Sequence, residues 1–141
     1  MANSFKERKE DIDRKFPLSI SYCHDSSLVQ LNETVAKDIL FDKYLWVTGT
    51  SLATKYYIES FVENAIKNTN IKKNDFILEI ASNDGSLLKT FMKKGYKNIL
   101  GVDPAKNLAN KANDDGVKTL PEFWNFALAS EIVKKYNSAK L

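Results

Sequence analysis

The sequence contains a single cysteine, no long apolar run and no strong excess of basic residues. Because Cys23 stands alone among 141 residues, an intrachain disulfide framework is excluded, and so is a cysteine-rich zinc site built by this chain alone. We therefore expect a reducing, cytoplasmic setting. No stretch reaches the ~18 consecutive apolar residues of a membrane span, and the charged residues 1–15 lack the apolar centre of a secretory signal. No membrane partner is expected.

The charges are spread evenly along the chain. Residues 1–73 hold eleven Lys and Arg against ten Asp and Glu, and residues 74–141 hold ten against eight, which together give the net charge of +3. Neither half is basic enough to indicate a nucleic-acid surface. The composition, 43% hydrophobic and 28% charged, is typical of a folded domain. We expect no nucleic-acid partner.

The first half of the chain predicts a small β and helical segment. Residues 1–15 lack an apolar stripe and are interpreted as a tail. Alternating apolar and polar side chains over residues 18–22 predict a half-buried strand, with residues 28–31 as its hairpin partner. A helix capped by Thr34 is expected to run through Phe41.

From residue 51 onward, segments with a helical period alternate with short apolar runs that are typical of strands. Residues 51–68 predict a helix whose inward positions are Leu52, Tyr56, Val62, Ala65 and Ile66, with Tyr57 and Phe61 beside them. From Asp75 onward, short apolar runs at 76–80, 99–102 and 117–120 alternate with helical patterns over 87–91 and 108–112. A last helix is expected to open at Pro121 and to turn Phe123, Phe126, Ala127 and Val133 inward.

This alternation indicates an α/β fold with a parallel sheet built from βαβ units. We expect a Rossmann-like sheet of three parallel strands with helices, preceded by the β and helical segment. The predicted organisation is a tail at 1–15, an N-terminal segment at 16–50 and a ligand-binding unit at 51–141.

Ligands of open parallel sheets bind where strands end and helices begin. The first such turn contains Asn83, Asp84 and Gly85: the glycine allows close backbone approach, and free helix N–H groups can receive a carboxylate. Asp103 follows the next strand, where a carboxylate can accept both hydroxyls of a ribose. Each feature has a structural alternative, because Asp103 could cap the next helix and residues 83–85 could form an ordinary turn.

The two turns favour a nucleoside ligand that lacks phosphate. A dinucleotide site requires the pattern G-x-G-x-x-G to bring the backbone against a pyrophosphate, and Ala81 and Asn83 occupy the first two of those glycine positions. S-adenosylmethionine (SAM) has no phosphate and needs fewer glycines. The order of the features therefore indicates SAM as the cofactor.

The residues also resemble a known family, the SAM-dependent C-methyltransferases that act on nucleotide-linked deoxysugars. The resemblance extends from residue 16 onward and is most specific in two runs, residues 78–88 and 101–109. Shorter matching stretches are residues 16–18, Cys23, residues 28–31, 40–41, Tyr44, residues 48–51 and residues 116–120.

The resemblance implies roles for individual residues. Glu79 and the turn of Ala81, Ser82, Asn83, Asp84 and Gly85 would hold the methionine end of SAM, Asp103 its ribose, and Pro104 with Phe123 the adenine. Tyr44, Thr48 and Ser51 would belong to a lid. The resemblance implies a nucleotide-sugar substrate, and the residue that would act as general base is unassigned.

The chain departs from the family pattern in three respects. Such proteins carry an N-terminal zinc module, but here Cys23 is followed at the second ligand position by Ser26, so no zinc is expected and residues 16–50 are interpreted as a remnant. Ala81 stands where the family usually has glycine. The family's sheet has about seven strands, so we expect an N-terminal half whose first strand has an unpaired edge, available for self-association.

The sequence leaves three functional hypotheses open. The chain is the cofactor-binding portion of a sugar C-methyltransferase, or a non-catalytic truncated relative that needs a partner chain, or a class I methyltransferase acting on another small molecule.

Overall fold

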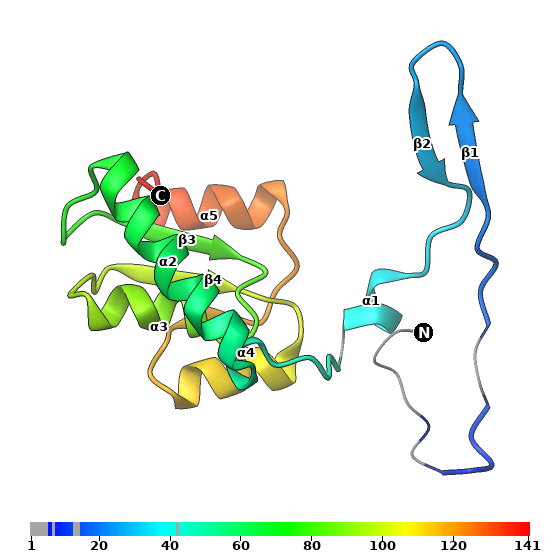
Figure 1. The fold of residues 1–141 in the computed structure, drawn as a ribbon, viewed down its shortest axis with the longest axis horizontal. Coiled ribbons are helices and arrows are strands. Elements are labelled where there is room, and N and C mark those ends of the chain that lie inside the picture. Colours follow the sequence, from blue (N-terminus) through cyan, green and yellow to red (C-terminus); the bar gives the residue numbers. More distant parts are fainter. Residues whose placement is uncertain (1–5, 7, 13–14, 42) are drawn as a thin grey trace. The chain divides into compact units, whose positions relative to one another are not determined.

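The computed structural model describes residues 6, 8–12, 15–41 and 43–141. The chain divides into two compact units, Met1–Leu45 and Trp46–Leu141 (Figure 1). The predicted tail at 1–15 falls only partly within the described residues, because residues 1–5, 7 and 13–14 lie outside them.

The first unit contains the predicted hairpin. Strand β1 (Ile20–Cys23) pairs antiparallel with β2 (Leu28–Leu31), so the hairpin prediction is confirmed, with the first strand beginning two residues later than expected. A short helix α1 (Lys37–Phe41) follows, and it starts at Lys37 rather than directly after Thr34. Every residue of β1 and β2 is exposed, so the predicted half-burial of the first strand was wrong, and within α1 Leu40 alone is half-buried.

The second unit is built around a three-stranded parallel sheet. A 3-10 turn, η1 (Thr48–Thr50), leads into α2 (Leu52–Thr69), and then β3 (Ile77–Ile80), α3 (Ser86–Lys93), β4 (Ile99–Val102), α4 (Lys106–Asp114), β5 (Thr119–Leu120) and α5 (Phe126–Tyr136) alternate. The strand order is β3-β4-β5, with both pairs parallel. The predicted α/β fold with three parallel strands and helices is therefore confirmed.

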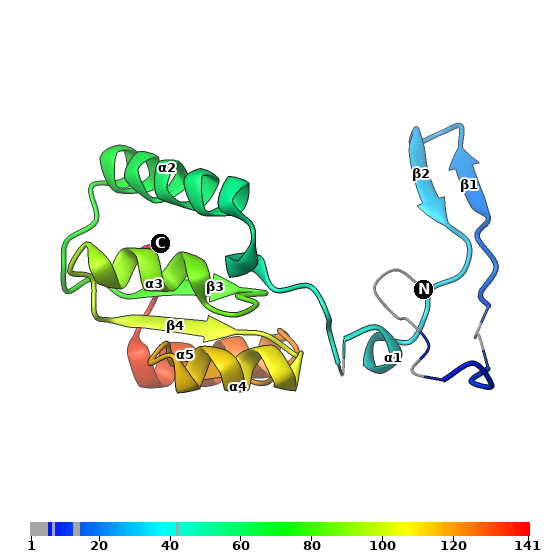
Figure 2. The ribbon, with the colours of Figure 1, turned by 60° about the horizontal axis from the view of Figure 1, so that its bottom comes forward.

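Two apolar clusters cover the two faces of this sheet. On one face Ile77 and Ile99 pack with residues of α2, α3 and Ala112 of α4. On the other face Leu100 and Val102 pack with Ile132 of α5. Figure 2 shows α2 and α5 on opposite sides of the strands. Neighbouring strand residues alternate between the faces, which is why β3 and β4 are apolar at every position except Glu79 and Gly101.

Helix α2 buries a narrower stripe than the sequence predicts. Ser51 begins it as a cap, accepting a hydrogen bond from the Thr54 N–H, and the inward residues are Ile58 and Val62, with Ala65 and Ile66 partly buried. Leu52 and Tyr56 of the predicted stripe are exposed, as are Tyr57 and Phe61 beside it. The helix itself is confirmed, but four of its aromatic and aliphatic side chains point to solvent.

The last helix begins later than predicted. Asn125 caps α5 by accepting a 3.0 Å hydrogen bond from the Leu128 N–H, so Pro121 lies in the preceding segment. The helix packs Leu128, Ile132 and Tyr136 against the sheet. The predicted inward face was wrong for Phe126, Ala127 and Val133, which are all exposed, and Phe123, which is half-buried, lies ahead of the helix.

The free edge of β3 is partly occupied by the chain itself. Lys140 N–H donates to the carbonyl of Phe76 at 2.8 Å, and Leu78 N–H donates to the carbonyl of Leu141 at 2.9 Å. The Leu141 side chain packs against the cluster that contains Ile77. The prediction of an unpaired edge was therefore wrong at Phe76 and Leu78.

Helices of membrane-spanning length and hydropathy do not occur in the described part of the chain.

Candidate functional site

The turn after β3 has an unusual backbone. Ala81, Asn83 and Gly85 all have positive φ angles, of 60°, 52° and 71°. At Gly85 a side chain is also excluded sterically, because an added Cβ would lie 2.8 Å from Cγ1 of Val117. The left-handed conformation disfavours L-residues other than asparagine and aspartate. This accounts for the glycine at 85, and it makes Ala81 a strained position.

We expect Ala81→Gly to stabilise the chain by about 1 kcal/mol. Glycine removes the steric cost of alanine at φ 60°, and the greater entropy of the unfolded glycine chain offsets part of that gain. Urea denaturation of the two proteins checks this. Ala53→Gly, at an exposed position in the first turn of α2, is the matched control and should destabilise the chain, by less than the ~1 kcal/mol that glycine costs in a helix interior. A loss of stability in Ala81→Gly would contradict the strain argument.

The side chains of Asn83 and Asp84 hold the segment that precedes α2. The Asn83 amide accepts from the Thr48 N–H at 2.9 Å and donates to the Trp46 carbonyl at 3.1 Å. The Asp84 carboxylate accepts from the Gly49 N–H at 3.1 Å. These bonds fix residues 46–49 against the turn, so the amide and the carboxylate have protein partners rather than being free for a ligand.

The three residues predicted to form a lid do not share one structural role. Thr48 contacts the turn through its backbone, as described above. Ser51 is the cap of α2, which gives its hydroxyl a structural role. Tyr44 belongs to the first unit.

Asp103 joins the two turns. Its side chain is 6% exposed, and its two oxygens accept hydrogen bonds from the Asn83 N–H at 2.7 Å and the Ala105 N–H at 2.9 Å. The residue thus supports the start of α4 and the first turn at the same time. Each carboxylate oxygen has a second lone pair, so these bonds leave capacity to accept a hydroxyl.

Glu79 carries the most perturbed group of this site. Burial raises the pKa of its carboxyl to about 8, and the charges of Asp84 and Asp103 add to the rise, while a hydrogen bond from the Leu88 backbone lowers it. Oε2 of Glu79 is buried without a hydrogen-bond partner. The same is true of the Ser82 hydroxyl, whose residue is 3% exposed. A buried polar atom without a partner is costly, so these two atoms indicate a place for a ligand or water.

Gly101 makes room for this arrangement, and the sequence interpretation did not single it out. It is paired with Glu79 across the sheet, and a Cβ on it would lie 2.5 Å from Oγ of Ser82 and 2.8 Å from Oγ1 of Thr119. The sequence signal was present, since a glycine inside a buried strand often marks a close approach. Glu79, Ser82 and Gly101 are therefore neighbours at the carboxyl end of the sheet.

The residues predicted to surround an adenine follow the next two strands. Pro104 is half-buried directly after Asp103, beyond β4. Phe123 is half-buried in the segment between β5 and α5. Both follow carboxyl ends of neighbouring strands, on the same edge of the sheet as the turn of residues 81–85.

No metal-binding arrangement is found among the described residues, where no three His, Cys, Asp or Glu side chains converge as ion ligands. Cys23 is exposed, and hydrogen bonds from the Ser26 side chain and backbone lower the pKa of its thiol. The expected absence of zinc remains a prediction.

Comparison with known proteins gives one informative similarity. No family model matches the chain. It is 31% identical over 126 residues to the C-methyltransferase NovU of Streptomyces niveus, an alignment that covers 89% of this chain and 30% of that protein. The chain thus spans about 30% of the length of this relative. Together with the parallel sheet flanked by helices, the similarity supports a methyltransferase family for this chain.

Proposed function

We propose that this chain binds SAM at the carboxyl ends of β3 and β4 and is the cofactor-binding part of a methyltransferase. The observation that carries the proposal is the pair of buried, unpartnered polar atoms, Oε2 of Glu79 and Oγ of Ser82. They lie beside carboxylates at Asp84 and Asp103, whose charges raise the pKa of Glu79. The charges of Asp84 and Asp103 beside the buried Glu79 favour a cationic ligand, and SAM carries an ammonium and a sulfonium.

The roles follow from the contacts of each residue. Glu79 and Ser82 have the only uncommitted buried side-chain oxygen atoms of the described chain, so they would receive the methionine end of SAM. Asp103 would accept the ribose hydroxyls with its remaining lone pairs. When bound, SAM supplies an electrophilic methyl group for a carbon nucleophile formed next to a ketone. By resemblance, the acceptor is a nucleotide-linked deoxysugar, and the group that removes its proton is unassigned.

Calorimetric titration of the chain with SAM at pH 7 tests the proposal. We expect saturable binding, weakened about tenfold or more by Asp103→Asn, because the amide keeps only one of two acceptor oxygens. Asp114→Asn, an exposed position on α4, is the matched control and should bind as the parent does. Absence of binding by the folded parent chain, or equal binding by Asp103→Asn, would count against a functional pocket.

A further inference from the structure

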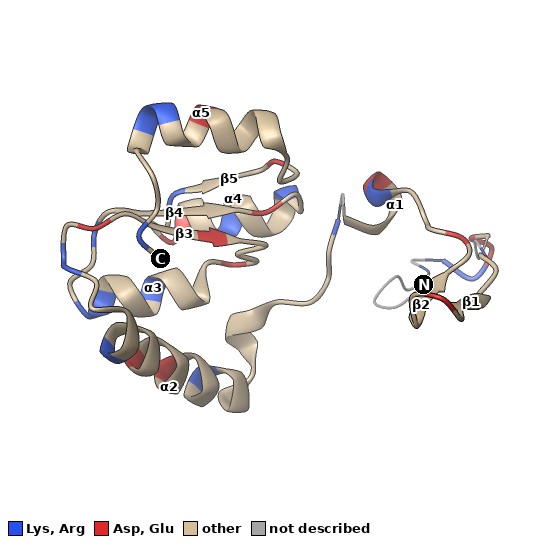
Figure 3. Cartoon of the chain, turned by 90° about the horizontal axis from the view of Figure 1, so that it is seen from above, with Lys and Arg blue, Asp and Glu red and all other residues tan. Residues whose placement is uncertain are grey.

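A cavity of about 350 Å³ lies between helices of the layer that covers one face of the sheet. Its walls come from α2, α3 and the end of α4, and the segment before α2 closes one end. Four of its lining residues are lysines, Lys55 from α2, Lys89 and Lys93 from α3, and Lys111 from α4. Figure 3 shows basic positions along these helices. The cavity is therefore rich in hydrogen-bond donors of positive charge.

Two of the lysines share one carboxylate oxygen. Oδ2 of Asp115 accepts from Nζ of Lys89 at 2.9 Å and from Nζ of Lys111 at 3.1 Å. These hydrogen bonds lower the pKa of Asp115, so its charge is fully present at neutral pH. The three residues keep a net charge of +1, and the two ammonium groups repel each other. A second anion beside them would relieve this repulsion.

The other two lysines are uncommitted. The structure gives neither Lys55 nor Lys93 an ion pair with a described residue, and both side chains are exposed. Three acids, Glu59, Asp84 and Asp115, also line the cavity, so with its four lysines the lining keeps a net charge of +1. Asp115 is already shared, and the Asp84 carboxylate is bonded to Gly49 N–H and to the Ser86 hydroxyl.

We propose that this cavity binds a diphosphate group, at a site that borders the turn after β3 through Asp84 and Ser86 and extends from there along α3. A diphosphate has several acceptor oxygens and more than one negative charge, which suits ammonium donors that arrive from three helices. Its lining includes α3 residues from Ser86 to Lys93, together with Gly49 and Thr50 of the segment before α2. The proposal does not depend on SAM binding.

Titration of the ¹⁵N-labelled chain with sodium pyrophosphate, at constant ionic strength and followed by NMR, tests this. We expect saturable shifts of the amides of Gly49, Thr50 and Lys89. Lys55→Gln and Lys93→Gln should each weaken binding about fivefold, and the double variant about 25-fold if the two sites act independently. A parallel titration with a nucleoside diphosphate distinguishes free diphosphate from its esters, and saturable binding of either one supports the proposal.

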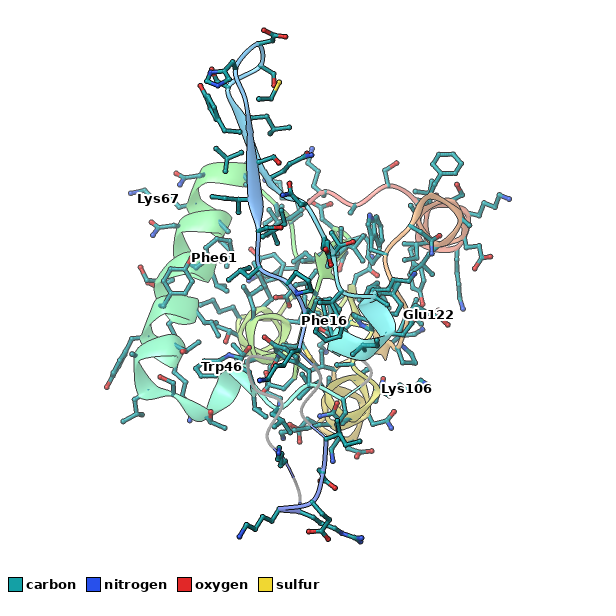
Figure 4. The ribbon with its side chains drawn as sticks, turned by 90° about the vertical axis from the view of Figure 1, so that its right-hand side faces the viewer. Phe16, Trp46, Phe61, Lys67, Lys106 and Glu122 are labelled. Atoms are coloured by element: carbon teal, nitrogen blue, oxygen red, sulfur yellow. The ribbon has the colours of Figure 1, made fainter. Side chains whose placement is uncertain are left out.

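Lys67→Gln is the matched control, because Lys67 lies on the same helix α2 but outside the cavity (Figure 4). It should leave the affinity unchanged within about twofold. The proposal is overturned if neither titrant gives saturable shifts. It is also overturned if Lys67→Gln weakens binding as much as Lys93→Gln, since attraction would then follow net charge alone.

Discussion

Glu79→Gln is expected to raise the free energy of unfolding at pH 7 by about 2 to 3 kcal/mol and to remove a pH dependence that the parent chain shows between about pH 5 and 8. The cause is the pKa of the Glu79 carboxyl, which lies at about 8 in the folded chain against 4.5 without these surroundings. The folded chain therefore binds this proton more tightly than the unfolded chain does.

The direction of the pH effect follows from that difference. The contribution of the protonated carboxyl to stability is fully present below about pH 4.5, and it is lost as the pH rises through 8. Each pH unit in this window costs about 1.4 kcal/mol. Glutamine is neutral at every pH and has nearly the same shape, so it avoids the cost, although its NH₂ group needs an acceptor.

Urea denaturation of both proteins at pH 5, 6, 7 and 8 measures the effect. The difference in stability between Glu79→Gln and the parent should widen steadily across this range. Glu122→Gln, an exposed glutamate ahead of α5, is the matched control and should show a constant difference near zero (Figure 4). Parallel pH profiles of the parent and Glu79→Gln would show that Glu79 is ionised in the folded chain at pH 7.

The periodic parts of the fold could be predicted from sequence because their burial is repeated along the chain. The strands at 77–80 and 99–102 are apolar at almost every position, which is the pattern of a strand covered on both faces. The start of α5 could not be placed in this way. Pro121 and Asn125 are both acceptable helix openers, and the face that α5 turns inward is decided by the packing of Ile132 in one cluster with Leu100 and Val102.

In the candidate site, too, some features follow from local sequence patterns and others depend on contacts between distant residues. The positions of Gly85 and Asp103 at strand ends follow from strand boundaries, which sequence patterns locate. The hydrogen bonds between the side chains of Asn83 and Asp84 and residues 46–49 cannot be located in this way, because they join residues that are 35 or more positions apart in the sequence. The pairing of Lys140 and Leu141 with the edge of β3 could not be predicted from sequence either, because two residues are too few to show a period.

Gly101→Ala is expected to destabilise the chain by about 2 to 3 kcal/mol. The new methyl group would lie 2.5 Å from Oγ of Ser82 and 2.8 Å from Oγ1 of Thr119, both far inside van der Waals contact. The Ser82 hydroxyl has no hydrogen-bond partner and can rotate, but the Ser82 Cβ, 3.0 Å from the new methyl group, and the Thr119 hydroxyl cannot move away without disturbing hydrogen bonds. The Ser82 backbone donates to the Val102 carbonyl at 3.2 Å, and the Thr119 hydroxyl donates to the Val117 carbonyl at 3.1 Å.

A double-mutant cycle separates this steric cost from a general effect of alanine in place of glycine. Ser82→Gly removes one of the two colliding side chains, so we expect it to recover at least about 1 kcal/mol when combined with Gly101→Ala. Gly116→Ala is the matched control, because a Cβ there meets nothing within 4 Å and its cost comes only from a φ of 83°. Ser82→Gly should leave that cost unchanged. Equal recovery in both backgrounds would mean that the methyl group introduced at position 101 does not collide with Ser82. The absence of a side chain at Gly101 would then need another explanation.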